Sequence, residues 1–247
     1  MTGAGSGLGQ ATARMLLGAG ASVALLDRNP AGIEALAKEF GSRAYPIVTD
    51  ICNAEDIFAA VESVVDHFGA LQVSVNCAGV ASSERIISKG LPHDIALWQR
   101  VIDVNLTGTF NVLRAVVTHM FNNAPDSQTG ERGVVINVAS IAAEDGQKGQ
   151  AAYAASKAGV IGLSLPVARD LADHAIRCIA ISPGLFKTEL FEQIPDKGVR
   201  ALTGSLLYPN RMGEPEEFAR LVSHIIENAY FNGCCVRLDG ATRLSGR

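Results

Sequence analysis

The segment TGAGSGLGQATARMLLGAG (2–20), followed at once by SVALLD (22–27), decides the fold of this chain of 247 residues. Gly3, Gly7 and Gly9 form a GxxxGxG spacing at the start of a helix-forming run. Without a Cβ atom the backbone can turn tightly and approach a pyrophosphate, and the N-terminus of the following helix attracts the anion. The spacing therefore predicts a turn that binds a dinucleotide, with Ser6 and Leu8 between its glycines.

The run SVALLD predicts a buried strand, and it ends in Asp27, about 20 residues after the turn. A carboxylate there can accept hydrogen bonds from the adenosine ribose and would repel a 2′-phosphate, which favours NAD over NADP. Arg28 weakens this preference, because it could contact such a phosphate. The alternative for Asp27 is a turn residue at the end of a strand. We expect NAD as the cofactor.

Apolar runs alternate with helical patterns along the whole chain. The predicted strands are 22–27, 43–50, 71–76, 134–140, 176–182 and 234–238, and the predicted helices are 31–40, 54–69, 94–121 with a break near Asn105, 151–174 and 214–228. Strands separated by helices of this length require right-handed parallel crossovers. The pattern predicts one α/β domain over 1–247, a Rossmann-type doubly wound parallel sheet between two helical layers. Ligands then bind beyond the carboxyl ends of the strands.

One feature conflicts with this fold. A dinucleotide-binding fold requires a strand before its glycine-rich turn, yet only Met1 and Thr2 precede Gly3. The sheet would then lack a central member, and the edges of its two neighbours would be unpaired. We expect the native start to lie upstream of Met1.

Composition excludes several classes of protein. The formal net charge is −4 and the basic residues are scattered, which argues against a nucleic-acid partner. The five cysteines have no metal-ligand spacing, and their odd number argues for a reducing compartment. There is no uninterrupted apolar run near 18 residues, so we expect no membrane span. We expect a cytoplasmic location, with the mitochondrial matrix as the alternative.

Three residues form a candidate catalytic group. Tyr153 and Lys157 are four positions apart in a helical pattern, so they share one helix face. A nearby ammonium stabilises a phenolate and lowers the pKa of the tyrosine towards neutrality. Ser140 ends the strand VVINVAS (134–140), where its hydroxyl could bind a substrate oxygen. Each pattern is common by chance, but together with the glycine-rich turn they indicate carbonyl–alcohol chemistry.

These motifs resemble the short-chain dehydrogenase/reductase family along nearly the whole chain. The matching patterns are TGAGSGLG (2–9), Asp50 with Ile51, NCAG (76–79), Asn105 in DVNLTG, Ser140, YAASK (153–157) and Pro183 with Gly184. Cys77 replaces the second asparagine of the usual NNAG.

The resemblance implies a role for each of these residues. Ser140 would position the substrate oxygen, Tyr153 would exchange its proton, and Lys157 would lower the tyrosine pKa and hold the nicotinamide ribose. Asn105 would support a water that relays protons to Lys157. The cofactor cleft would be lined by Asp50 and Ile51 at the adenine, by Asn76, Cys77, Ala78 and Gly79, by Pro183 and Gly184, and by Thr188 at the carboxamide.

Several loops narrow the resemblance to the type-2 3-hydroxyacyl-CoA dehydrogenases of this family. They are APDSQTGERGVVINVAS (124–140), GQAAYAASKAGV (149–160), SPGLFKTEL (182–190) and NGCCVRLDGATRLSG (232–246). The resemblance implies NAD-linked oxidation of a 3-hydroxyacyl-CoA to the 3-ketoacyl-CoA in a homotetramer, with steroid alcohols as side substrates.

The segment 185–212 is irregular and rich in large apolar residues. A stretch of this length in a compact domain is typical of a lid. We expect it to close over an acyl chain or ring system. The residues expected to contact the substrate are Ser140, Leu185, Phe186, Leu190 and Leu206.

Two alternatives remain open at this point. The first is an NADPH-dependent 3-ketoacyl reductase that acts on an acyl carrier protein or on another carbonyl, against which Asp27 argues. The second is a non-catalytic NAD-binding scaffold, against which the presence of both Tyr153 and Lys157 argues.

Overall fold

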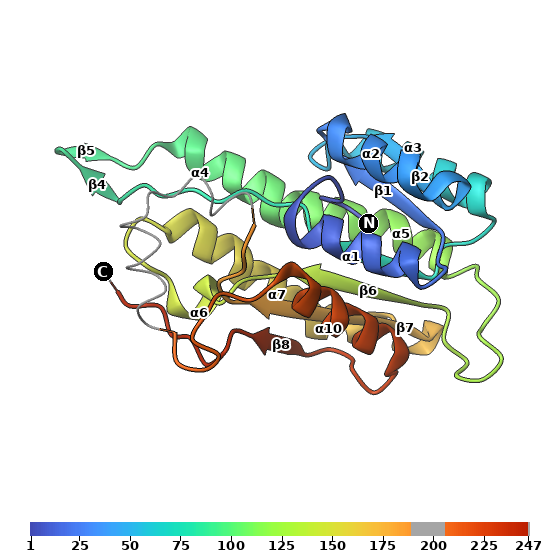
Figure 1. Cartoon of the computed structure of the whole chain (residues 1–247). Helices are drawn as coiled ribbons and strands as arrows, with labels where there is room; N and C mark the ends of the chain where they lie inside the picture. The colour runs from blue at the N-terminus through green and yellow to red at the C-terminus, as the bar shows by residue number, and fades with distance from the viewer. Residues whose placement is uncertain (189–205, 247) are drawn as a thin grey trace.

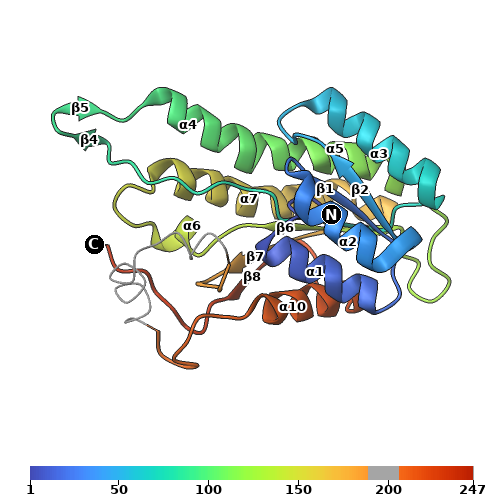
Figure 2. The same ribbon diagram turned by 45° about the horizontal axis from the view of Figure 1, so that its top comes forward.

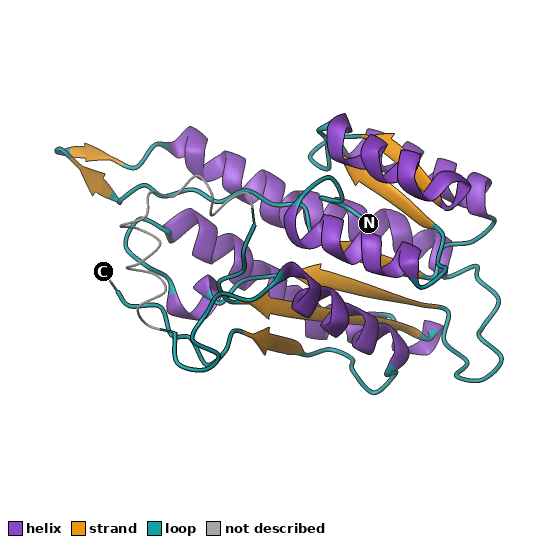
Figure 3. Ribbon diagram, viewed as in Figure 1, coloured by secondary structure: helices purple, strands orange, loops and turns teal. Residues whose placement is uncertain are grey.

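A computed structural model describes residues 1–188 and 206–246 of the chain. Helices cover both faces of a central parallel sheet (Figures 1 and 3). The helices are α1 Gly7–Gly18, α2 Pro30–Phe40, α3 Ala54–Phe68, α4 Ile95–Ile102, α5 Thr109–Met120, α6 Ala142–Asp145, α7 Ala151–Asp170 and α10 Pro215–Glu227. The predicted doubly wound α/β fold is confirmed.

The sheet has two parts. The strands are β1 Val23–Asp27, β2 Ala44–Val48, β3 Val73–Asn76, β6 Gly133–Val138, β7 Ile176–Pro183 and β8 Cys235–Leu238. One part pairs β1 with β2, and the other has the order β3-β6-β7-β8. All these pairs are parallel. Their carboxyl ends therefore lie at one edge of the sheet, where the predicted site residues follow the strands.

Residues 1–4 join the two parts of the sheet. Thr2 forms parallel bridges with Leu26 on one side and with Asn76 on the other. The Met1 ammonium donates to the Ala24 carbonyl (2.9 Å), and the Thr2 N–H donates to the Val75 carbonyl (3.1 Å). The central position that was expected to be vacant is thus held by Met1 and Thr2 at the carboxyl ends of β1 and β3.

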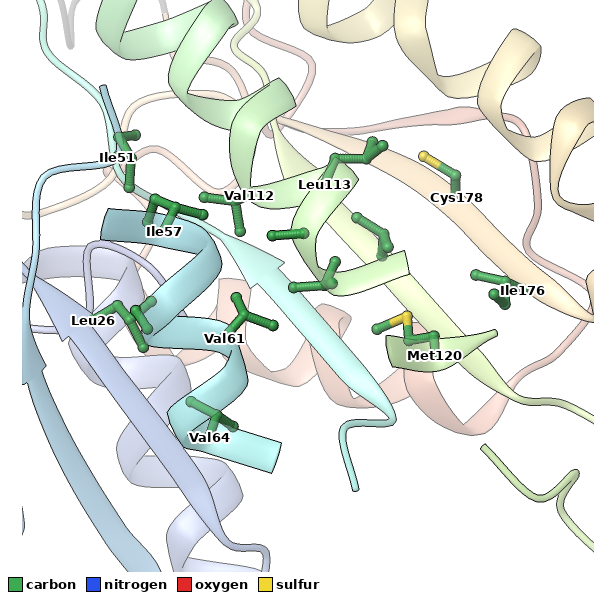
Figure 4. Packing of buried hydrophobic residues seen from close by; sticks show 14 of the residues in the cluster. Leu26, Ile51, Ile57, Val61, Val64, Val112, Leu113, Met120, Ile176 and Cys178 are labelled. Carbon is green, nitrogen blue, oxygen red and sulfur yellow. The ribbon is translucent and has the colours of Figure 1, made fainter. Parts of the chain in front are cut away.

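Two helical layers bury the two faces of the sheet. On one face α3, α5 and α7 pack against the strands, and on the other α1, α2 and α10 do so (Figure 2). Figure 4 shows the first of these cores, in which Val61 and Val64 of α3 face Val112 and Met120 of α5. The apolar stripe of each helix thus supplies the burial that stabilises the fold.

The predicted helix 94–121 breaks in its middle, near Asn105, where a break was expected. The helix is interrupted by a π-helical turn, Asp103–Gly108, which separates α4 from α5 and contains Asn105. Just before α4, a short antiparallel hairpin projects from the body (Figure 2), with strands β4 Ile87–Ser88 and β5 Leu91–Pro92. No apolar alternation marks this hairpin in the sequence, so it was not predicted.

Helix α7 is long and apolar enough to cross a membrane by length and composition alone. The structure instead packs it against β7 and buries Val160, Lys157 and Ala168. Pro166 lies inside the helix, although a proline removes one backbone hydrogen bond there. Helix α7 therefore belongs to the core of the domain in the part of the chain that the structure describes.

A buried ion pair closes the end of the sheet opposite to the site. Arg177 of β7 donates to Glu131 (2.6 Å) and to the carbonyls of Ile225 (2.9 Å) and Phe231 (3.0 Å), beyond which the chain enters β8. Replacing Arg177 with alanine leaves Glu131 and these carbonyls without partners. We expect the free energy of unfolding to fall by about 3–5 kcal/mol, measured by urea denaturation.

The matched control is Arg14→Ala, which breaks the ion pair between Arg14 and Glu39. Both side chains are about half exposed, so the loss should stay below about 1 kcal/mol. Equal losses for the two variants would contradict this account of the Arg177 contacts.

Candidate active site

The glycine-rich turn is held in a close-packed geometry that only glycine permits. A Cβ atom on Gly9 would lie 2.0 Å from the Gly3 carbonyl oxygen, and one on Gly3 would lie 2.7 Å from the Ala78 nitrogen. Gly3 and Gly7 also have positive φ angles. The turn ends where α1 begins at Gly7, so the free N–H groups of this helix point to the carboxyl edge of the sheet.

Asp27 at the end of β1 is tied to the same turn. Its Oδ2 accepts from the Gly5 N–H (2.9 Å), and its Oδ1 accepts from the Asn29 N–H (2.9 Å). Gly32 of α2 packs directly on Gly5 of this turn, because a Cβ on Gly32 would lie 1.9 Å from the Gly5 carbonyl oxygen. Asp27 therefore fixes the turn, and each of its oxygens keeps a lone pair that can accept a ribose hydroxyl.

A cavity of about 670 Å³ runs along the carboxyl edge of the sheet. It begins at the glycine-rich turn, passes the ends of β1, β2 and β3, and reaches the ends of β6 and β7. Eighteen of the predicted residues line it: Gly3, Ser6, Gly7, Leu8, Gly9, Asp27, Asp50, Ile51, Cys77, Ala78, Gly79, Ser140, Tyr153, Lys157, Pro183, Gly184, Phe186 and Thr188. The structure thus brings the two predicted groups, nucleotide turn and catalytic residues, into one cavity.

The three candidate catalytic residues come from β6 and α7. Lys157 is buried, and its Nζ donates to the Val138 carbonyl at the end of β6 (2.8 Å). Tyr153 lies one helical turn earlier on α7, with its ring centroid 6.0 Å from Lys157 Nζ. Ser140 follows β6, and its hydroxyl accepts from the Ala142 N–H (3.1 Å) while it interacts with the Tyr153 phenol. The site therefore presents two hydroxyls side by side, with an ammonium behind them.

Burial dominates the electrostatics of this group. It raises the pKa of the Tyr153 phenol, and the hydrogen bond with Ser140 opposes that rise. It also lowers the pKa of the Lys157 ammonium to about 8. The Ser140 hydroxyl beside the phenol thus favours the phenolate. That Lys157 also lowers the tyrosine pKa stays a prediction.

Asn105 lies behind the cavity wall. It is fully buried in the π-helical turn, where Oδ1 accepts from the Val80 N–H (2.8 Å) and Nδ2 donates to Ser156 Oγ (3.1 Å). Gly79, which lines the cavity, lies against it, because a Cβ on Gly79 would lie 3.2 Å from Asn105 Oδ1 and 3.3 Å from Lys157 Nζ. Asn105, Gly79 and Lys157 are therefore neighbours, and the water relay that the resemblance implied stays a prediction.

Some predicted residues lie away from the cavity. Asn76 is buried and donates to Asn137 Oδ1 (2.8 Å), so its side chain joins two strands. Leu185 and Leu206 do not line the cavity, and Phe186 both lines it and packs edge-on against Phe218 of α10. Leu190 and positions 189–205 of the expected lid 185–212 lie outside the described residues.

The structure also adds residues to the cavity that the sequence did not reveal. One group comes from α4 and the π-helical turn, and the other follows β3. They are Leu97, Arg100, Val101 and Val104, and then Val80, Ala81 and Ser82. The helical period of α4 marks an amphipathic face, but it does not distinguish a face that packs on the core from one that borders a cavity.

Comparisons with known proteins agree on one family. The family model described as short chain dehydrogenase matches residues 1–198. The chain is 48% identical over 246 residues to the human 3-hydroxyacyl-CoA dehydrogenase type-2, covering 99% of this chain and 94% of that protein.

Two solved structures extend the agreement to the fold. A 3-hydroxyacyl-CoA dehydrogenase type-2 from Mycobacterium avium superimposes with a TM-score of 0.94 at 37% identity, covering 100% of this chain and 95% of that one. A 3-ketoacyl-(acyl-carrier-protein) reductase from Brucella melitensis, complexed with NADH, gives a TM-score of 0.86 at 27% identity, covering 98% of this chain and 96% of that one.

The burial of Lys157 predicts a measurable effect of pH on stability. At pH 7 the ammonium is charged and buried, so Lys157→Met should stabilise the protein without cofactor by about 1–3 kcal/mol. Because burial lowers the folded-state pKa to about 8 from 10.5, the penalty is complete below pH 8. It disappears as the pH rises towards 10.5, so the difference between variant and wild type should shrink over that range.

Urea denaturation at several pH values checks this, with the exposed Lys38→Met as the control. Lys38 should show little change at any pH. A Lys157→Met variant that is less stable than wild type at pH 7, or a difference that does not vary with pH, would contradict the prediction.

Proposed function

The chain belongs to the short-chain dehydrogenase family and is an oxidoreductase, and we propose that it oxidises 3-hydroxyacyl-CoA to 3-ketoacyl-CoA with NAD. The observation that carries the proposal is the cavity that joins the glycine-rich turn and Asp27 to Ser140, Tyr153 and Lys157. A nucleotide bound along this edge would extend from Asp27 to the catalytic group.

The residues present fit a nicotinamide dinucleotide. The glycine-rich turn has no room for side chains, so its N–H groups and the start of α1 are open to a pyrophosphate. Asp27 offers acceptors for the adenosine ribose, and Asp50 and Ile51 border the same end of the cavity. NAD rather than NADP is supported by the Asp27 carboxylate, although Arg28 also lines the cavity there.

The proposed mechanism assigns one task to each catalytic residue. A bound nicotinamide would supply the acceptor for the hydride on the carbon that carries the substrate hydroxyl. Tyr153 takes the proton of that hydroxyl during oxidation and returns it during reduction. Before the substrate binds, the contact of Ser140 with the phenol opposes the rise of the phenol pKa; in the substrate complex the Ser140 O–H donates to the substrate oxygen instead.

Lys157 and Asn105 support this transfer. With a folded-state pKa of about 8, Lys157 stands near the point at which it can give or take a proton at neutral pH. Asn105 holds the turn after β3 through both hydrogen bonds to Val80, which keeps Gly79 against Lys157. We propose that protons leave the site past Lys157 and Asn105.

The acyl-CoA assignment rests on the relatives. Two 3-hydroxyacyl-CoA dehydrogenases of type 2 cover nearly the whole chain, at 48% and 37% identity. The described part of the cavity beside Ser140 is consistent with an apolar chain, because Phe186 and Val138 border it. Positions 185–212 are proposed to close over that chain as a lid.

Tyr153→Phe removes only the phenolic hydroxyl. We expect it to lower kcat for the reduction of acetoacetyl-CoA by NADH about 100- to 10,000-fold, while NADH still binds.

The wild type should use NADPH far less efficiently than NADH, because Asp27 repels a 2′-phosphate. Absorbance of the reduced nicotinamide gives the rates, and fluorescence titration gives NADH binding.

Each outcome has a distinct meaning. Wild-type turnover of an acetoacetyl group on acyl carrier protein with NADPH, and none of acetoacetyl-CoA, would favour the carrier-protein reductase instead. A wild type that binds NADH but reduces no carbonyl would favour the scaffold role.

We also propose a homotetramer in a reducing compartment, either the cytoplasm or the mitochondrial matrix. The hairpin β4–β5 and the start of α4 expose Ile86, Ile87, Leu91 and Ile95, and a large exposed apolar patch often marks an interface. All five cysteines are free, which supports the reducing compartment. Sedimentation should give a mass about four times 25.9 kDa, and a single-chain mass would contradict the tetramer.

A further inference from the structure

Arg237 of β8 lies outside the cavity, but it connects two of the segments that border it. Its Nη1 donates to Glu144 (2.7 Å) and its Nη2 to Asp145 (2.9 Å), both on α6. Its Nε donates to Asp239 (2.9 Å), just after β8. The Arg237, Asp145 and Asp239 side chains are 19%, 18% and 9% exposed, so these contacts are largely shielded from water, whereas Glu144 is 53% exposed.

The first segment is the one that carries Ser140. The backbone on either side of Ser140 is fixed by β7, because Ala139 donates to Ile181 (2.8 Å) and Ile141 donates to Pro183 (3.1 Å). The direction of the Ser140 hydroxyl depends on α6 instead, since it accepts from the Ala142 N–H. The orientation of this four-residue helix is in turn fixed at its far end by Glu144 and Asp145 on Arg237.

The second segment is the turn after β7. Gly184 packs directly on Asp239, because a Cβ on Gly184 would lie 2.8 Å from both Cα and Cβ of Asp239. The Gly184 N–H also donates to the Leu238 carbonyl (2.9 Å). Pro183 and Gly184 line the cavity, so the position of Asp239 defines the wall that faces Ser140.

Charge makes Arg237 necessary for this arrangement. Glu144, Asp145 and Asp239 place three carboxylates around one guanidinium. Arg243 reaches only Asp239 (3.1 Å) and is 63% exposed. Without Arg237 the Asp145 and Asp239 carboxylates, both largely buried, would repel one another across a poorly solvated gap.

We propose that Arg237 is a positioning residue that holds α6, and through it the Ser140 hydroxyl, in the geometry that proton transfer by Tyr153 requires. The inference rests on the proposed function, in which Ser140 and Tyr153 act on the same substrate oxygen. Arg237 itself touches neither substrate nor cofactor.

The test compares Arg237→Met with wild type in the oxidation direction. We expect kcat to fall about 10- to 100-fold, because displacement of a catalytic group by about 1 Å has an effect of this size. KM and the NADH dissociation constant should change less than about threefold, since the glycine-rich turn and Asp27 do not contact this network and Gly184 stays hydrogen-bonded to the Leu238 carbonyl. The rise of kcat/KM with pH, which reports the free enzyme, should move to higher pH, because a displaced Ser140 no longer favours the Tyr153 phenolate.

Three further variants separate positioning from general loss of structure. Asp145→Asn breaks one α6 contact, keeps Arg237 in place, and should give a smaller shift of the pH profile in the same direction. Arg237→Lys keeps the charge and should recover part of kcat. Arg243→Met, which loses a contact with the same Asp239 but none with α6, should match wild type in kcat and pH profile.

The kcat of each variant, relative to that of the wild type, can be measured with any alcohol that the wild type oxidises. The result therefore does not depend on acyl-CoA as the substrate. A normal pH profile in both Arg237→Met and Asp145→Asn would overturn the inference. If the wild type oxidises no alcohol, the proposed function fails. Hydrogen exchange then decides the inference: amides 142–145 should exchange faster in Arg237→Met and not in Arg243→Met, and unchanged exchange would overturn it.

Discussion

The hydrogen bond from Lys157 Nζ to the Val138 carbonyl is the contact on which the catalytic geometry depends. It joins α7 to the end of β6 inside a largely apolar environment, where an unpaired ammonium would be very unfavourable. Tyr153 stands one turn before Lys157, and Ser140 stands two residues after Val138. This buried contact therefore holds the turn of α7 that carries Tyr153 against the end of β6, beside Ser140.

At the glycine-rich turn, Asp27 has a comparable structural role. This carboxylate holds the Gly5 N–H of the glycine-rich turn, and residues 1–4 in turn link β1 to β3. The adenosine end and the catalytic end thus lie on the two parts of the sheet, which meet at Thr2. Because all strands are parallel, both ends open on the same edge, and one cavity serves them both.

The sequence alone predicted the parallel sheet, most helix positions and the residues of the nucleotide turn, because each rests on local patterns such as glycine spacing or apolar runs. It also grouped Ser140, Tyr153 and Lys157, because these patterns, each common by chance, occur together with the glycine-rich turn. Contacts between distant segments were not predictable. The period of α4 marks an apolar face but not that this face borders the cavity, and the Arg237 contacts with α6 leave no periodic signal, since they depend on how β8 and α6 pack. The contact of Ser140 with the Tyr153 phenol likewise depends on how β6 and α7 pack, which spacing does not reveal.

The central claim is that the Tyr153 phenol transfers the proton of the substrate hydroxyl. The most direct test replaces Tyr153 alone with 3-fluorotyrosine and measures how kcat for alcohol oxidation depends on pH. The fluorinated phenol is more acidic and nearly the same size, so the account predicts that the rise of kcat with pH moves to lower pH while NADH binding is preserved. An active enzyme with an unchanged pH profile would show that another group transfers the proton.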